Sequence, residues 1–178
     1  MLTACGGGGD DAAPAARAPG PAPAPVPSPA VASTCGLPDF AANALARINQ
    51  HRAAGANCRT RGSFAPAAAL RWDNLLTRAA DAHSRDMQAN NFFSHTGSNG
   101  SSLSQRVDAT GYAWSSVGEN IAAGYPGVTA AVDGWMASDG HCANLMNPNF
   151  DEFGLACVSG DASNTYRTYW TMDLARSR

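Results

Sequence analysis

An abrupt change in composition near Cys35 limits what this chain can fold into. The segment before it, residues 6–34, is mainly glycine, alanine and proline, as in the run Pro21-Ala22-Pro23-Ala24-Pro25. Such a segment buries too little apolar surface to offset the entropy lost on ordering, so we expect an extended tether. Residues 35–178 are then predicted to form the folded part, which has the size of one ordinary domain.

The charge of the chain gives no sign of a nucleic-acid partner. The net charge is −2, and the twelve basic residues are all arginines that are scattered along the sequence. A nucleic-acid-binding domain would gather its basic residues on one face. No apolar run approaches the length needed to cross a bilayer. We therefore expect a monomer that binds no nucleic acid.

The first cysteine suggests a membrane anchor. Cys5 ends the tetrapeptide Leu2-Thr3-Ala4-Cys5, which resembles the lipobox of bacterial lipoproteins, where the cysteine is lipidated. We interpret residues 1–34 as the remnant of a truncated lipoprotein signal followed by the linker, although the apolar core of a signal peptide does not precede Cys5. A lipid at Cys5 would anchor the protein to a membrane without spanning it.

The other four cysteines suggest two disulfides formed in an oxidising compartment. They are Cys35, Cys58, Cys142 and Cys157. No pair of them forms a C-x-x-C motif, and four cysteines allow three pairings. We predict Cys35–Cys58 and Cys142–Cys157, because each bridge would tie the segments that flank one helical unit.

The periodicity of apolar residues predicts helices first and strands last. Helices are expected over 39–52, with Asp39 as N-cap, over 73–90, from the capping box at Ser102 to before Gly111, and over 128–138, with a further helical turn near Asn144. Strands are expected over 153–158 and 168–174, and residues 112–119 are expected to be extended. This order predicts an α+β domain with helices packed on a small antiparallel sheet.

The candidate chemical groups are two histidines and one glutamate. His95 and His141 lie beside glycine and serine in loops or at helix starts, where functional groups gather. His83, on an apolar helix stripe, is interpreted as a core histidine bonded to a backbone carbonyl. Two imidazoles with the carboxylate of Glu119 are a common ligand set for zinc or another divalent cation. The same three groups could instead form an acid–base network, or Glu119 could only cap a backbone segment.

Several short motifs, in this order, make residues 40–174 resemble the bacterial branch of the CAP family (cysteine-rich secretory protein, antigen 5 and pathogenesis-related 1; also called SCP). The motifs are Leu70-Arg71-Trp72-Asp73, Ala82-His83-Ser84-Arg85-Asp86-Met87, Phe93-Ser94-His95, Gly118-Glu119-Asn120-Ile121-Ala122-Ala123-Gly124, Trp135-Met136-Ala137-Ser138-Asp139-Gly140-His141, Asn144-Leu145-Met146 and Tyr169-Trp170-Thr171.

The resemblance implies a three-layer α-β-α sandwich with a large cleft. Family members hold two histidines and two acids in this cleft; His95, Glu119 and His141 occupy three of these positions, and the second acid falls near Ser138, which departs from the pattern. The resemblance also implies binding of zinc or another divalent ion, and of lipids or sterols elsewhere on the domain.

These observations predict an exported protein, either an envelope lipoprotein or secreted and extracellular. We expect a cleft that binds a divalent metal and a lipid or cell-envelope ligand, without assigning catalysis. The alternative is a metal-dependent, protease-like hydrolase that uses His95, Glu119 and His141, with Glu119 as general base. A third possibility is that these three residues only hold loops together.

Overall fold

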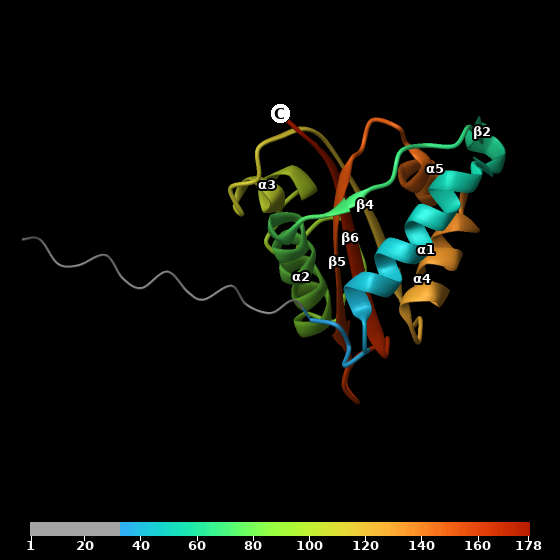
Figure 1. The fold of residues 1–178 in the computed structure, drawn as a ribbon. Coiled ribbons are helices and arrows are strands. Elements are labelled where there is room, and N and C mark those ends of the chain that lie inside the picture. Colours follow the sequence, from blue (N-terminus) through green and yellow to red (C-terminus); the bar gives the residue numbers. More distant parts are fainter. Residues whose placement is uncertain (1–32) are drawn as a thin grey trace, which may run out of the picture.

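The structure is a computed structural model that describes residues 33–178 (Figure 1). The predicted lipidation at Cys5 and most of the predicted tether lie outside the described residues. The fold includes the two residues before the predicted boundary at Cys35, because the backbone N–H of Cys157 donates to the carbonyl of Ser33 and Thr34 forms a bridge with Cys157. Among the described helices, none has both the length and the apolar character of a membrane span.

A four-stranded sheet forms the centre of the domain, in the order β3-β5-β6-β4. Its strands are β3 (Arg71–Trp72), β4 (Trp114–Ala123), β5 (Glu152–Ser159) and β6 (Thr168–Ser177). The three long strands are antiparallel, as predicted, whereas the two-residue strand β3 runs parallel to β5. Trp72 of β3 packs edge-on against Phe153 of β5, with ring centroids 5.3 Å apart. The sheet is therefore mixed rather than purely antiparallel.

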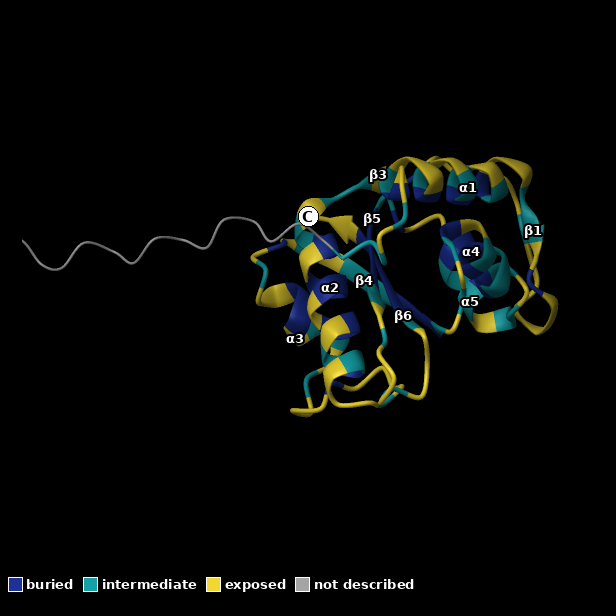
Figure 2. Cartoon of the chain, turned by 90° about the horizontal axis from the view of Figure 1, so that it is seen from below, coloured by how far each residue is buried: buried dark blue, intermediate teal, exposed yellow. Residues whose placement is uncertain are grey.

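Helices cover both faces of this sheet, which gives the α+β, three-layer arrangement (Figures 1 and 2). One layer contains α2 (Asn74–Ala89) and α3 (Leu103–Asp108); the other contains α1 (Phe40–Ala54), α4 (Val128–Met136) and α5 (Asp139–Met146). The short elements β1 (Ala56–Asn57), η1 (Arg59–Arg61) and β2 (Ser63–Phe64) follow α1. The helices occur where apolar periodicity predicts them, with α5 longer than the single turn expected.

One of the two predicted helix caps is present, and Asp73 supplies a cap that was not predicted. The Asp73 carboxylate accepts from the backbone N–H groups of Leu75 and Leu76, and Ser102 with Gln105 forms the predicted capping box. The prediction for Asp39 was wrong: it precedes α1 in a left-handed conformation, with φ 50°, and its side chain makes no capping bond. An N-cap that accepts from the first turn normally has extended backbone angles, which this turn does not provide.

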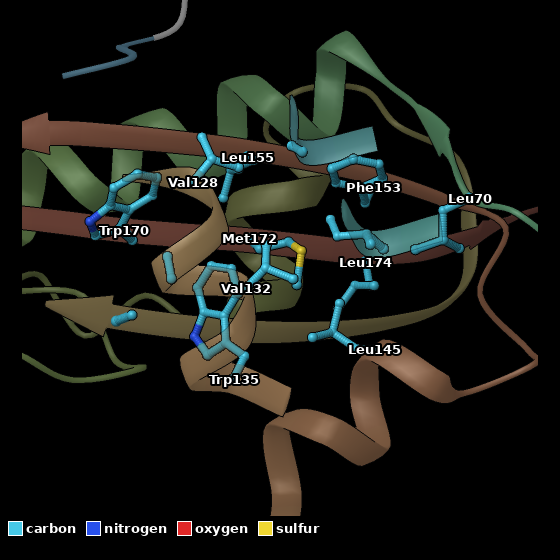
Figure 3. Close-up of a cluster of buried hydrophobic side chains, with 14 of the residues drawn as sticks. Leu70, Val128, Val132, Trp135, Leu145, Phe153, Leu155, Trp170, Met172 and Leu174 are labelled. Atoms are coloured by element: carbon cyan, nitrogen blue, oxygen red, sulfur yellow. The ribbon is translucent and has the colours of Figure 1, made fainter. Parts of the chain in front are cut away.

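The main hydrophobic core lies between the sheet and the layer of α1, α4 and α5. Trp170, Met172 and Leu174 alternate along β6, point into this core and meet Val132 and Trp135 of α4 (Figure 3). The opposite face of β6 packs on α2: the Ser84 hydroxyl donates to Thr171, for example. Both faces of β6 are therefore buried, so its polar residues lie in the interior as well.

Side chains from the helices close the free edge of β4. The indole N–H of Trp135 donates to the carbonyl of Ile121 at 3.0 Å, and the amide of Asn144 donates to the carbonyl of Glu119 at 3.2 Å. An edge strand with open carbonyls can pair with another chain. These two contacts occupy the outward carbonyls in the middle of β4, which prevents such pairing there.

The predicted disulfide pairing was wrong. The bridges are Cys35–Cys157 and Cys58–Cys142. Cys35 and Cys58 lie beyond opposite ends of α1, and its 15 residues span about 22 Å, whereas bridged cysteines have Cα atoms less than about 7 Å apart. One bridge instead joins the chain before α1 to β5, and the other joins the loop after α1 to α5.

Candidate functional site

The three predicted site residues line one cavity of about 380 Å³. Its walls are His95, Glu119, His141, Arg61, Gly140, Ala143 and Asn144. His95 comes from the loop after α2, Glu119 from β4 and His141 from the first turn of α5. We refer to this cavity as the two-histidine pocket.

The end of α2 places His95. The chain turns at Asn91, which has φ 49°, and Phe92 then packs inward against Met87 and Tyr169. Buried His83 lies 2.9 Å from the carbonyl of Ser94, measured from its Nε2 atom. Burial lowers the pKa of His83, so the neutral ring donates this bond. His83 is thus the core histidine that the sequence predicts, and it holds the loop that carries His95.

Glu119 is buried, and both of its carboxylate oxygens have a partner. Its side chain is 3% exposed; one carboxylate oxygen lies 2.7 Å from Nδ1 of His95, and the other lies 2.6 Å from Nη2 of Arg106. Burial alone would raise the pKa of Glu119, but the His95 hydrogen bond and the positive charge of Arg106 outweigh it and lower this pKa. The carboxylate is therefore ionised, and Nδ1 of His95 must donate the proton between them.

Arg106 is a site residue that sequence reasoning missed. Its side chain is 8% exposed, and besides the ion pair with Glu119 it donates to the backbone carbonyls of His95 and Ser101. The guanidinium thus fixes both the loop that carries His95 and the carboxylate that orients the His95 ring. The capping box that starts α3 at Ser102 places Arg106 in the last turn of this helix.

Asp173 is the second residue that was missed. It is the cross-strand partner of Glu119, is fully buried, and neither carboxyl oxygen has a hydrogen-bond partner within residues 33–178. Burial and the neighbouring charge of Glu119 raise the pKa of Asp173 well above its ordinary value. Both effects favour the neutral, protonated form of Asp173, which pairs with Glu119 across β6 and β4.

Replacing Asp173 by asparagine is expected to stabilise the domain near pH 7. The folded protein holds a proton on Asp173 that the unfolded chain releases above about pH 4, so this residue lowers stability as the pH rises. The amide is neutral at every pH and removes that cost. Urea unfolding should show a gain at pH 7 that shrinks toward zero near pH 3.5. A loss of stability in Asp173→Asn that is confined to neutral pH would contradict a protonated Asp173, because it would mean that this carboxyl group is ionised in the folded protein.

His141 is oriented by Ser138. Its Nδ1 lies 2.9 Å from the Ser138 hydroxyl oxygen, so this serine orients the ring. Burial, and then the proximity of His95, lower the pKa of His141, which favours the neutral ring. In both rings Nδ1 has a partner, while neither Nε2 has one within the described part of the chain.

The three predicted metal ligands, His95, Glu119 and His141, line this pocket. Across residues 33–178, no group of three His, Cys, Asp or Glu side chains is arranged to hold a metal ion. Both oxygens of Glu119 are already engaged by His95 and Arg106. The ring nitrogens without a partner in residues 33–178 are the two Nε2 atoms, while Glu119 and Ser138 contact the Nδ1 atoms of His95 and His141. Metal-binding histidines typically have this kind of support on the second ring nitrogen.

Residues 45–174 match the family model described as the Cysteine-rich secretory protein family. Two curated relatives come from Bacillus subtilis: the uncharacterized membrane protein YlbC is 39% identical over 88 residues, and the uncharacterized protein YkwD is 36% identical over 89 residues. These matches cover 49% and 50% of this chain, but only 25% and 35% of the relatives. The chain thus accounts for about a third or less of either relative.

Solved structures share the fold. An extracellular protein containing a SCP domain from Bacillus anthracis has a TM-score of 0.58 and 29% identity, over 79% of this chain and 44% of that one. An outer surface protein from Borrelia burgdorferi has a TM-score of 0.56 and 19% identity, over 63% of this chain and 80% of that one. At 19% identity the second likeness concerns the fold alone.

Proposed function

The chain belongs to the cysteine-rich secretory protein family, and from this premise we propose that it is an exported binding protein. Its two-histidine pocket takes up a divalent metal ion such as Zn²⁺, and its cleft receives a lipid or cell-envelope ligand. Two disulfides suit an oxidising compartment, and the Bacillus anthracis protein of similar fold is described as extracellular. Anchoring through a lipid on Cys5 is part of the same proposal.

The metal proposal rests on the orientation of two imidazole rings, each of which has a hydrogen-bond partner at Nδ1. Nδ1 of His95 donates to Glu119, and Nδ1 of His141 lies at the Ser138 hydroxyl. In this tautomer Nε2 of His95 carries the lone pair that binds a metal, and Nε2 of His141 does the same when its Nδ1–H donates to the Ser138 hydroxyl oxygen. Both rings line the same cavity, so they supply two nitrogen ligands and leave the other coordination positions to water or a ligand. A bound Zn²⁺ would supply Lewis acidity there.

The engagement of Glu119 favours binding over hydrolysis. A general base must reach the proton that it removes and must have a pKa near the working pH. Glu119 is 3% exposed, is bonded through both oxygens, and has a lowered pKa. In this arrangement the carboxylate orients His95 and is poorly placed to accept a proton from water. The hydrolase alternative would therefore need a base other than Glu119.

We expect calorimetry at pH 7.5 to show uptake of one zinc ion per chain. His95→Ala and His141→Ala should each weaken zinc binding at least tenfold, because each removes one of two protein ligands. Binding should also weaken below about pH 6, where imidazoles become protonated. His51→Ala is the matched control, because His51 pairs with Asp133 and does not line the pocket.

Two results would overturn the metal proposal. One is the absence of zinc uptake by the intact protein near neutral pH. The other is an equal loss of affinity in His51→Ala and in the two pocket variants, which would indicate unspecific binding to imidazoles. Circular dichroism of each variant would establish that the loss does not come from unfolding.

A further inference from the structure

A second cavity adjoins the two-histidine pocket at His141. Its volume is about 320 Å³, and its walls are Phe93, Ile121, Ala122, Ala123, Tyr125, Gly134, Trp135, Ser138, His141 and Tyr166. His141 therefore lies between the two cavities, and Phe93 precedes His95 by two residues. We call this second cavity the aromatic subsite.

The aromatic subsite carries the two large hydrophobic side chains that are exposed in residues 33–178. Phe93 is 43% exposed and Tyr166 is 37% exposed. They contact each other, with ring centroids 5.7 Å apart, and Tyr166 rests edge-on against buried Tyr169 at 5.8 Å. Single exposed apolar residues are common, but paired rings at the mouth of a cavity are typical of binding sites.

The local sequence forces Phe93 outward. Its neighbour Phe92 packs into the core with Met87 and Tyr169, and the Ser94 carbonyl is held by His83. With the Phe92 side chain packed inward and the Ser94 carbonyl held by His83, Phe93 is left on the surface. Tyr166 is placed by the loop between β5 and β6, whose Thr165 backbone N–H donates to the side chain of Asn91. Both rings are therefore positioned before any ligand arrives.

The lining of the subsite selects a neutral ligand with hydroxyl groups. No Asp, Glu, Lys or Arg lines this cavity, so it offers no partner for a charged group. Its polar groups are the hydroxyls of Tyr125, Ser138 and Tyr166 and the ring of His141. An extended peptide would need open backbone groups on β4, but Trp135 and Asn144 already occupy the outward carbonyls of Ile121 and Glu119.

We propose that the aromatic subsite binds a sugar ring of a neutral saccharide, which stacks on Phe93 and Tyr166 and exchanges hydrogen bonds with Ser138 and His141. A pyranose ring has apolar C–H faces and hydroxyl groups at its rim, which matches aromatic faces bordered by hydroxyls. This inference rests on the proposed function, because it names the envelope ligand of the same cleft as a glycan.

The test is a titration of the full chain with the β-linked trimer of N-acetylglucosamine, followed by NMR of ¹⁵N-labelled protein. We expect saturable shifts at Phe93, Ser138 and Tyr166. Phe93→Ala and Tyr166→Ala should each weaken binding roughly tenfold, on the scale of a lost aromatic contact. Tyr166→Phe keeps the ring face and should weaken it by less than threefold. Both rings are partly exposed and belong to no buried core, so the alanine variants are expected to fold.

Zinc titration of the same variants separates this inference from the proposed function. Phe93→Ala and Tyr166→Ala should take up zinc as the intact protein does. No saccharide binding together with normal zinc uptake would overturn the saccharide inference alone. Saccharide binding without zinc uptake would overturn the metal proposal alone. Decanoate or a neutral peptide could instead change the NMR chemical shifts of Phe93 and Tyr166 while the saccharide does not. That result would mean that the ligand is not a saccharide.

Discussion

Replacing Arg106 by methionine is expected to destabilise the domain by about 3–5 kcal/mol, which is the usual cost of removing one partner from a buried ion pair. Arg106 and Glu119 are 8% and 3% exposed and lie 2.6 Å apart. Methionine keeps much of the apolar stem, so the main change is the loss of the charge. Glu119 would then be an ionised carboxylate in the interior with His95 as its remaining partner. Urea unfolding at pH 7 measures the effect.

Two comparisons make this prediction specific. Arg78→Met is the matched surface control, because exposed Arg78 makes no hydrogen bond or ion pair within residues 33–178, and it should change stability by less than about 0.5 kcal/mol. Adding Glu119→Gln to Arg106→Met should recover part of the loss, because no unpaired charge remains buried. A loss below about 1 kcal/mol for Arg106→Met, or no recovery in the double variant, would contradict a buried pair.

The pH dependence of the Arg106→Met variant follows from the same pair. The pKa of Glu119 is lowered in the folded protein, so its ionised form contributes stability above its unfolded value, and this contribution is lost as the pH falls through the folded pKa. In Arg106→Met the carboxylate has lost its cation and its pKa should rise. The stability difference between the two proteins should therefore shrink as the pH falls from the raised pKa of Glu119 in the variant to its lowered pKa in the intact protein.

Local sequence patterns predict most of the fold because they depend on short-range physics. Apolar spacing identifies α1, α2 and α4, and the side chains of Asp73 and Ser102 mark true helix starts. The alternation of Trp170, Met172 and Leu174 correctly predicts which face of β6 meets the main core. Asp39 shows the limit of this reasoning, because a residue type that suits an N-cap can still occupy a left-handed turn.

The residues that were missed depend on contacts between distant segments. Asp173 lies on the polar face of the alternating strand β6. This face would be exposed to water if helices covered only one face of the sheet. Here α2 covers that face, so Asp173 lies in the interior. Arg106 belongs to a short polar helix and resembles any exposed arginine until β4 brings Glu119 beside it. Asp173 could have been identified from the sequence as a charged residue on a strand whose two faces are both expected to be covered by helices.

Pairs of cysteines are also set by distant contacts, which is why proximity in sequence predicted the wrong bridges. Each observed bridge closes a long loop, with sequence separations of 122 and 84 residues. Removing either one should cost about 5 kcal/mol in the chain-entropy model, and measured losses are commonly about 2–5 kcal/mol. Mass spectrometry of unreduced peptides should recover Cys35–Cys157 and Cys58–Cys142. Recovery of any other pairing would contradict the fold around α1.

The two bridges are expected to differ in their effect on the two-histidine pocket. Cys142 follows His141 in α5, and its bridge ties α5 to the η1 loop, where the Thr60 backbone N–H also donates to Asp139 at 3.1 Å. Cys35–Cys157 lies outside the pocket lining. Under conditions where both proteins remain folded, Cys58→Ala/Cys142→Ala should lose zinc affinity about tenfold, while Cys35→Ala/Cys157→Ala should lose stability alone. Equal zinc affinities in the two variants would mean that α5 holds His141 in place without its disulfide.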